Sequence, residues 1–401
     1  MTASPDNQPS ESHALSPSAK IVDKALADFD AELDWLTRFT PNNIDYVWQS
    51  FRDSNFKTAP RLAYDDTGVD LPAMRSKLFA LPVQEIDEAL IEALLIEKQR
   101  EIDRQIELVR MRESSGVIVA SMDLFGSVDE TLRNTAEAIL ADVPDMQQHP
   151  RDSNADAFVA AATAEMSWYH EQDSNFRYAA HINPVSGSSL YTSAGDLYVA
   201  HDYRAAAARI DPLIQHEIGT HTVTRYNGEQ QPLHVLSCGL PDYDALQEGI
   251  AVLGEYLAGY LPPHRLRILA GRVIAADMAV HENPVEQIFA KLHDGHGFEE
   301  MIAFDTAIRA VRGGGLTKDA LYLKGLIELL SYLQQGGDFE ILFLGKFALK
   351  QLPVLEKLIA NGVVNPPSIL PRYMQKPDMA ARLEKVRNID ITEFYQESPI
   401  P

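Results

Sequence analysis

Residues 211–228 read DPLIQHEIGTHTVTRYNG, and the interpretation of the whole chain starts from this stretch. Its apolar residues predict a helix, and the helix carries His216, Glu217 and His221. The common metal-binding signature on a helix is HExxH, in which two histidines four residues apart share one face. Here the spacing is HExxxH, so a regular helix would place the two imidazoles about 140° apart.

A π-bulge would restore a shared face, because it absorbs one extra residue into a helical turn, and such bulges are frequent at functional sites. Gly219 lies between the two histidines and would ease this distortion. We therefore expect a π-bulge in this helix and a zinc site held by His216 and His221.

A carboxylate on the next predicted helix completes the ligand set. Residues 244–259 read DALQEGIAVLGEYLAG, and Glu248 lies among mostly apolar residues. A buried carboxylate is costly unless it is paired or bound to a metal. Two histidines, one carboxylate and a water form an open, catalytic kind of zinc site. Glu255 lies seven residues later near the same face, so it is either a partner that orients a ligand histidine or a rival ligand; we favour Glu248 as the ligand.

Three motifs together resemble those of a known family. They are HEIGTH (216–221), LQEGIAVLGEYLAG (246–259) and RGGGLTKDALYLKG (312–325). They are similar to motifs of the microtubule-associated tyrosine carboxypeptidase family, whose bacterial members carry a QEGLA motif that reads QEGIA here, with Ile250 in place of Leu. The resemblance covers much of residues 175–370.

The resemblance implies a role for each site residue. His216, His221 and Glu248 would be the zinc ligands, and Glu217 would be the catalytic carboxylate. The animal members remove a C-terminal tyrosine from tubulin. That substrate is not carried over to this chain, which is strongly acidic and has no basic run to hold an acidic tail.

The expected chemistry is metal-assisted amide hydrolysis at the C-terminus of a peptide or protein. Zinc would activate a bound water, and Glu217 would accept its proton as general base. Tyr322, Tyr226 and His234 are candidate donors to the oxyanion. An exposed edge within residues 188–200 is a candidate place for substrate backbone to add as a strand.

A carboxypeptidase must also bind the terminal carboxylate of its substrate. An arginine suits this task because its planar fork matches a carboxylate. Arg312 is the first candidate and Lys318 the second, since both lie in the family-like segment. Arg225 follows His221 by four residues and is the third candidate. The alternative for all three is a solvated or salt-bridged surface charge, and for Lys318 and Arg225 this is the simpler role.

The expected fold is α+β and mainly helical, a gluzincin-like zinc peptidase core with a small β-sheet before the HExxxH helix. Short strands and turns are expected between Asn175 and Asp202. The expected parts are a disordered tail (1–18), a helical N-terminal region (19–170), the metallopeptidase core (171–370) and a C-terminal tail (371–401). Helices are expected at 21–39, 85–112, 131–141, 155–170, 205–227, 243–260, 264–280, 285–294, 298–311, 317–335 and 343–361.

Composition limits the partners and the compartment. The chain has 401 residues and a net charge of −23, which disfavours binding to nucleic acid or to an anionic membrane. The single cysteine, Cys238, excludes an internal disulfide and a cysteine-based zinc site. The first twenty residues lack the apolar core of a secretory signal, and no run is long and apolar enough for a transmembrane helix. We therefore expect a cytoplasmic protein.

Two further interpretations stay open from the sequence. One is a different zinc hydrolase, such as an amidase or a dipeptidyl peptidase; the dipeptidyl peptidases with HExxxH carry paired glutamates in their second motif, whereas this chain has Gln247 and Glu248. The other is a non-catalytic, metal-stabilised regulatory or binding protein. The presence of Glu217 argues against the latter, because a purely structural zinc needs no base.

Overall fold

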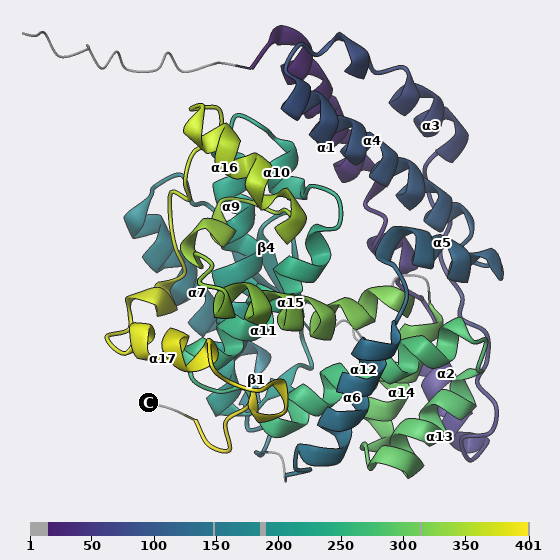
Figure 1. Ribbon diagram of the computed structural model, residues 1–401. Coiled ribbons are helices and arrows are strands. Elements are labelled where there is room, and N and C mark those ends of the chain that lie inside the picture. The colour runs from purple at the N-terminus through teal and green to yellow at the C-terminus, as the bar shows by residue number, and fades with distance from the viewer. Residues whose placement is uncertain (1–14, 147–148, 185–189, 313–314, 400–401) are drawn as a thin grey trace, which may run out of the picture.

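The computed structural model describes residues 15–146, 149–184, 190–312 and 315–399. It is an α+β protein and mainly helical, as the sequence predicts (Figure 1). None of the described helices is long and apolar enough to cross a membrane. The α-helices are α1 (Pro17–Leu33), α2 (Ile44–Asp53), α3 (Leu71–Phe79), α4 (Ala89–Arg110), α5 (Gly116–Phe125), α6 (Glu130–Asp142), α7 (Ala155–Gln172), α8 (Ile210–His216), α9 (Val223–Glu229), α10 (Val235–Cys238), α11 (Tyr243–Ala258), α12 (Pro263–Val280), α13 (Val285–His296), α14 (Glu300–Val311), α15 (Leu321–Gln334), α16 (Leu352–Ala360) and α17 (Met379–Val386).

The larger sheet lies directly before the histidine-bearing helix, within the segment predicted to form strands. It consists of β2 (Ala180–Asn183), β3 (Leu190–Ser193) and β4 (Asp196–Ala200) in the order β2–β4–β3. β4 runs parallel to β2 and antiparallel to β3. Ala194 and Gly195 turn the β3–β4 hairpin with φ angles of 49° and 92°, as a tight hairpin turn requires. A second, two-stranded sheet pairs β1 (Ser153–Asn154) with β5 (Arg204–Ala205).

Most predicted helices match the structure to within a few residues, but two were too long. The helix expected at 21–39 ends at Leu33, because Asp34 adopts a left-handed conformation with φ of 36°. The helix expected at 343–361 begins only at Leu352, with a proline in its first turn. Five of the described α-helices were missed: α2, α3, α5, α10 and α17. The side chain of Asp70, which caps the start of α3, was a signal that could have revealed that helix.

The termini of the described chain pack on the helical body. The predicted tail 1–18 falls outside the described residues as far as residue 14, and α1 begins at Pro17. Near the other end, the side-chain amide oxygen of Gln396 accepts a hydrogen bond from the backbone N–H of Leu261 at 2.6 Å. Arg382 donates to the carbonyl oxygen of Leu257 at 2.9 Å. The segment predicted as a C-terminal tail therefore covers the end of α11.

A buried ion pair ties the N-terminal helices to the start of α11. Lys98 on α4 is fully buried, and its ammonium lies 2.9 Å from a carboxylate oxygen of Asp30 and 2.8 Å from one of Glu101. The other oxygen of Glu101 accepts a hydrogen bond from the backbone N–H of Asp242 at 3.2 Å. Because Asp242 immediately precedes α11, these N-terminal helices help to place the helix that carries Glu248.

α11 and α15 cross at two glycines that let their backbones touch. Every residue of α11 from Leu246 to Ala258 is buried. A Cβ atom on Gly249 would lie 2.5 Å from the carbonyl oxygen of Gly325, and one on Gly325 would lie 1.7 Å from that of Ala245. No side chain fits into such contacts. This crossing brings the start of α15 next to Glu248.

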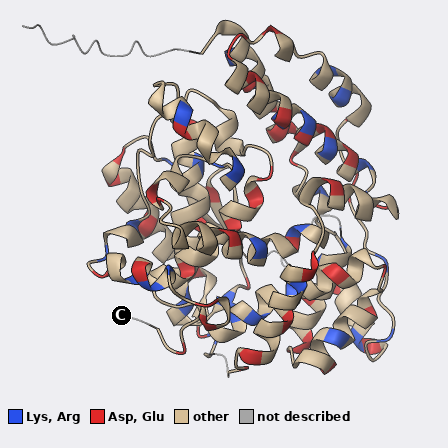
Figure 2. Cartoon of the chain, in the orientation of Figure 1, with Lys and Arg blue, Asp and Glu red and all other residues tan. Residues whose placement is uncertain are grey.

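Charged residues are spread over the whole described chain (Figure 2). Asp and Glu occur on helices from the N-terminal to the C-terminal part, with Lys and Arg between them. The net charge of −23 is therefore not concentrated in one segment.

Gly325→Ala tests the close crossing of α11 and α15. We expect the variant to be destabilised by about 1–3 kcal/mol, because the added methyl group must push two backbones apart. The melting temperature measures this effect. Gly295→Ala in α13 is the matched control, since a Cβ there would meet only the flexible side chain of Lys291 at 3.7 Å. A control that melts no lower than the parent, beside a lower-melting Gly325 variant, supports the crossing; equal melting of all three proteins would contradict it.

Candidate metal centre

The helix that carries the histidines contains the expected π-bulge. α8 ends at His216, residues Glu217–Thr222 form a π-helical segment, and α9 continues from Val223. The wider turn absorbs one residue, so His216 and His221 meet on one face as in HExxH. The hydroxyl of Thr220 donates to the carbonyl oxygen of Gln215 at 3.2 Å, five residues back, which satisfies an acceptor displaced by the bulge.

Gly219 contributes to the bulge in a way that the sequence only partly indicates. A Cβ atom at this position would lie 2.6 Å from the side-chain oxygen of Gln215. Gln215 in turn donates through its amide to Glu165 on α7 at 3.0 Å. Glycine therefore leaves room for a side chain that anchors the bulged helix to its neighbour.

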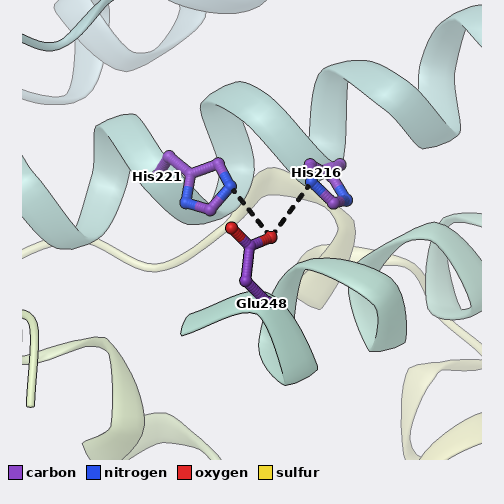
Figure 3. A group of neighbouring side chains, drawn as sticks. All are labelled: His216, His221 and Glu248. Carbon is purple, nitrogen blue, oxygen red and sulfur yellow. Dashed lines mark ion pairs between the residues drawn. The ribbon is translucent and has the colours of Figure 1, made fainter. Parts of the chain in front are cut away.

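His216, His221 and Glu248 converge on one point (Figure 3). The Nε2 atoms of His216 and His221 lie 3.7 and 3.8 Å from the same oxygen, Oε2 of Glu248. One ligand atom from each residue lies within 4.8 Å of the other two. Ligands at ordinary zinc distances in a tetrahedral site are separated by about 3.3–3.6 Å. These three residues could hold a metal ion.

The chemistry of Glu248 fits a bound cation. Its Oε2 atom is buried and has no hydrogen-bond partner among the described residues. A buried carboxylate oxygen left without a partner costs free energy, and a metal ion would satisfy it. Burial and the neighbouring positive charge of His216 hold the pKa of His221 well below its usual value. Neutral imidazole is the form that binds a metal.

Glu255 orients His216 and is not part of the converging set. Its Oε1 atom lies 2.9 Å from Nδ1 of His216, which leaves Nε2 of that ring directed at Glu248. Arg265 lies 3.1 Å from the same carboxylate, and Arg209 pairs with its other oxygen. Burial would raise the pKa of Glu255, but Arg265 and Arg209 hold it well below its usual value. The structure thus places Glu248, and not Glu255, against both histidines.

Glu217 lies beside the histidines with one oxygen held in place. Its Oε2 atom accepts a hydrogen bond from the hydroxyl of Thr192 at 2.7 Å. Thr192 belongs to β3, an edge strand of the sheet, so the sheet positions this carboxylate. Burial raises the pKa of Glu217, and the positive charge of His216 opposes that shift. A carboxylate with a raised pKa is better suited to accept a proton near neutral pH.

Lys318 and Tyr322 lie beside Glu248, on the side of α15. The ammonium of Lys318, in the 3-10 turn η5 (Leu316–Ala320), is 3.0 Å from Asp244 and 3.9 Å from Glu248. Burial and the Glu248 carboxylate raise the pKa of Tyr322, so its hydroxyl keeps its proton and can donate a hydrogen bond. The guanidinium of Arg272 lies 4.7 Å from the centre of the Tyr322 ring.

The other sequence candidates lie elsewhere or are engaged. Arg225 pairs with Glu229 at 2.9 Å, one turn further along α9. Arg312 ends α14, and burial and Arg309 lower its pKa to about 10. Tyr64 and two aspartates are the other charges acting on Arg312, so its surroundings differ from those of the histidines.

Two candidate oxyanion donors also have other partners. The hydroxyl of Tyr226 donates to Asp173 at 2.6 Å. The imidazole of His234 lies 2.8 Å from Asp23 on α1, an aspartate that also accepts from the backbone N–H of Val235. Both contacts link one segment of the fold to another. Of the three candidate donors, Tyr322 is the one whose pKa is raised, beyond the effect of burial, by the Glu248 carboxylate.

Several residues of the site were missed from the sequence. These residues come from three different segments: Thr192 from β3, Arg209 from the turn before α8, and Arg265 and Arg272 from α12. No sequence motif in these segments predicts a contact with the site. The seven-residue spacing of Arg265 and Arg272, which puts them on one face of α12, was the available signal. Lys346 was also missed; its charge lowers the pKa of His221.

Glu255→Gln tests the orienting role of this carboxylate. We expect zinc affinity, measured by competition with a chromophoric chelator, to fall about 10–100-fold. The amide would hold the His216 ring less firmly and would leave Arg209 and Arg265 without a negative partner. Glu328→Gln on the exposed face of α15 is the control and should bind zinc like the parent. Unchanged affinity in a folded Glu255 variant, with folding checked by circular dichroism, would contradict the role.

The chain matches a family model and several known proteins. The model of the microtubule-associated tyrosine carboxypeptidase family matches residues 49–390. Microtubule-associated tyrosine carboxypeptidase 1 of Rattus norvegicus is 22% identical over 397 residues, which is 95% of this chain and 73% of the rat protein. The proteins of the same name from Mus musculus and Homo sapiens are 25% and 26% identical over 206 residues, 48% of this chain and 41% of each relative.

One solved structure aligns weakly with this chain. A crystal structure of a protein from Colwellia psychrerythraea aligns with a TM-score of 0.42 and 12% identity, over 88% of this chain and 74% of that one. The family model, by contrast, spans most of the chain and includes the two histidines, Glu217 and Glu248. The resemblance seen in the sequence is confirmed: this chain belongs to the microtubule-associated tyrosine carboxypeptidase family.

Proposed function

We propose that this protein is a zinc-dependent metallocarboxypeptidase that releases the last residue of a peptide or protein, with a preference for an aromatic residue. The observation that carries the proposal is the convergence of His216, His221 and Glu248 beside the carboxylate of Glu217. Three protein ligands leave a coordination position open for water, as in catalytic zinc sites. The family supplies the reaction class, because its name denotes the removal of a C-terminal tyrosine.

Glu217 is the proposed general base. When bound, zinc would polarise the scissile carbonyl and make its water a stronger acid. The Glu217 carboxylate accepts a proton from that water and later returns it to the leaving amine. Thr192 donates a hydrogen bond to one oxygen of this carboxylate, which leaves the other oxygen to accept the proton. Tyr322, whose pKa burial and the nearby Glu248 carboxylate raise, is the proposed donor of a hydrogen bond to the developing oxyanion.

The ligand arrangement is that of a gluzincin-like core, in which a helix with two histidines precedes a helix with the third ligand. The edge strand β3 lies beside Glu217 and is the proposed place where substrate backbone pairs. Residues 188–189 of the predicted edge lie outside the described chain, whereas Leu190–Ser193 form the strand.

Glu217→Gln tests the catalytic proposal. The assay incubates the protein with peptides that differ only in their last residue and reads the products by mass spectrometry. We expect the parent to release one C-terminal residue and the variant to be about 10²–10⁴-fold slower, because the amide cannot accept a proton. Glu328→Gln, which removes an exposed carboxylate on α15, should cleave like the parent.

The outcomes separate the rival functions. Release of a dipeptide from either end, or cleavage of a small amide only, would replace the carboxypeptidase proposal with another hydrolase. Intact peptides in a sample that contains one zinc per chain would favour a binding or regulatory role. Equal rates for the parent and the Glu217 variant would rule out Glu217 as the base.

Removal of the metal provides a second test. Treatment with 1,10-phenanthroline should abolish cleavage, and added zinc should restore it. The melting temperature should fall on removal of the metal, because an ion bound at 100 times its dissociation constant stabilises the folded state by about 2.7 kcal/mol. The same titration on Glu248→Gln should give a much smaller change in melting temperature. Full activity after complete removal of the metal, verified by elemental analysis, would overturn the zinc proposal.

A further inference from the structure

Most cations around the proposed metal centre are already paired with acids of this chain. Lys318 lies 3.0 Å from Asp244, and Arg265 lies 3.1 Å from Glu255. A third cation, Arg309 on α14, makes a two-pronged contact with Asp319 at 2.6 and 2.7 Å. Each of these three cations already has a carboxylate partner in the chain. A charged group of a substrate would have to compete with that partner, so none of the three is the best candidate to bind it.

Arg272 differs from these cations. It is half-buried on α12, and it makes no hydrogen bond or ion pair with any residue in the part of the chain that the structure describes. Its guanidinium lies over the face of Tyr322, whose ring centre is 4.7 Å from the guanidinium carbon. Burial and the charge of Arg309 lower its pKa, which means that its positive charge is poorly compensated. A partly desolvated guanidinium in this state favours an incoming anion.

The position of Arg272 relates it to the metal centre. Arg272 follows Arg265 by seven residues, so the two share one face of α12 about 10.5 Å apart along its axis. Arg265 contacts Glu255, which contacts His216. Arg272 itself contacts the ring of Tyr322, which follows the turn that carries Lys318. The ammonium of Lys318 is 3.9 Å from Glu248.

The local charge balance also leaves a positive excess. The charges that act on Arg272 are those of Arg309, Asp319 and Arg265. Arg309 is paired with Asp319 and Arg265 with Glu255, so the charge of Arg272 itself is left without a partner among the described residues. In a chain of net charge −23, such an excess beside the proposed metal centre would attract an anionic group of the substrate.

We propose that Arg272 binds the terminal carboxylate of the peptide substrate. The inference rests on the proposed carboxypeptidase function, and it replaces Arg312, Lys318 and Arg225 in that role. The terminal carboxylate lies about one residue, or about 3.8 Å, beyond the scissile bond, so its anchor must lie close to the metal centre. The planar guanidinium of Arg272 offers two parallel donors to a carboxylate, and the Tyr322 ring beneath it holds the plane in place.

Lys346 is the competing cation. It follows the 3-10 turn η6 (Glu340–Phe343), and its ammonium lies 5.7 Å from the centre of the Tyr243 ring. Burial lowers its pKa to about 8, and no acid is paired with it among the described residues. An ammonium is a single point charge without the two-pronged geometry of a guanidinium. Arg272 is therefore the assigned anchor, and the test includes Lys346.

The test compares peptides of one sequence with a free or an amidated C-terminus. Binding is measured by fluorescence anisotropy to zinc-loaded Glu217→Gln, in which cleavage is slow. We expect the free carboxylate to bind more tightly than the amide in this background. Addition of Arg272→Gln should weaken binding of the free peptide roughly 30-fold or more and remove the preference, as the loss of one partner of a desolvated charge pair does. Arg272→Lys should restore only part of it.

Other variants make the test specific. Arg133→Gln, an exposed arginine on α6, is the control and should keep the full preference. Zinc content and melting temperature are measured for every variant, so that a loss of fold is not taken for a loss of the anchor. Retention of the preference in Arg272→Gln, or its loss in Arg312→Gln or Lys346→Gln instead, would overturn the proposal.

Steady-state kinetics separate this proposal from the function on which it rests. In the cleaving parent, Arg272→Gln should lower kcat/KM for free peptides mainly through a higher KM, whereas Glu217→Gln lowers kcat. If the parent cleaves nothing, the carboxypeptidase proposal fails, and the binding preference still reports on Arg272. If the parent cleaves amidated and free peptides equally, the anchor proposal fails while the hydrolase remains.

Discussion

The structure of the candidate site depends on one constraint: two histidines five residues apart must face the same point. A regular helix cannot meet it, because five steps turn the side chains about 140° apart. The π-helical segment Glu217–Thr222 meets it by widening one turn. The cost of the irregular turn is limited by Gly219, which makes room for Gln215, and by Thr220, which satisfies a displaced carbonyl group.

The opposite wall of the site depends on close helix packing. Gly249 and Gly325 allow α11 and α15 to approach until their backbones touch. As a result, Glu248 from α11 and Lys318 and Tyr322 from the α15 side lie together, although they are some seventy residues apart in the sequence. The proposed catalytic carboxylate, by contrast, is placed by a strand, through the contact between Thr192 and Glu217. Helix, sheet and helix crossing thus each position one part of the site.

Buried charges around the centre are arranged in compensated groups. Glu255 is fully buried and would be costly alone, but two arginines and His216 surround it. Removal of either arginine would leave the buried Glu255 carboxylate with one cationic partner fewer, so this group is structural as well as orienting. Arg272 lacks such compensation among the described residues, which is the basis for assigning a substrate group to it. An acidic protein can in this way keep a local site for an anion.

Much of this protein could be predicted from local sequence. Helical periodicity located α4, α7 and α11 through α15, and HEIGTH with QEGIA named the histidines, Glu217 and Glu248, because ligand chemistry and spacing are local properties. The sequence also predicted the π-bulge, since the spacing requires it. Only the tertiary structure decided which cations surround the centre. Arg209 precedes α8 and Arg265 and Arg272 lie on α12, whereas Arg312 and Arg225 have other neighbours. The physical reason is that long charged side chains choose their partners by distance in the folded chain, which no local pattern encodes.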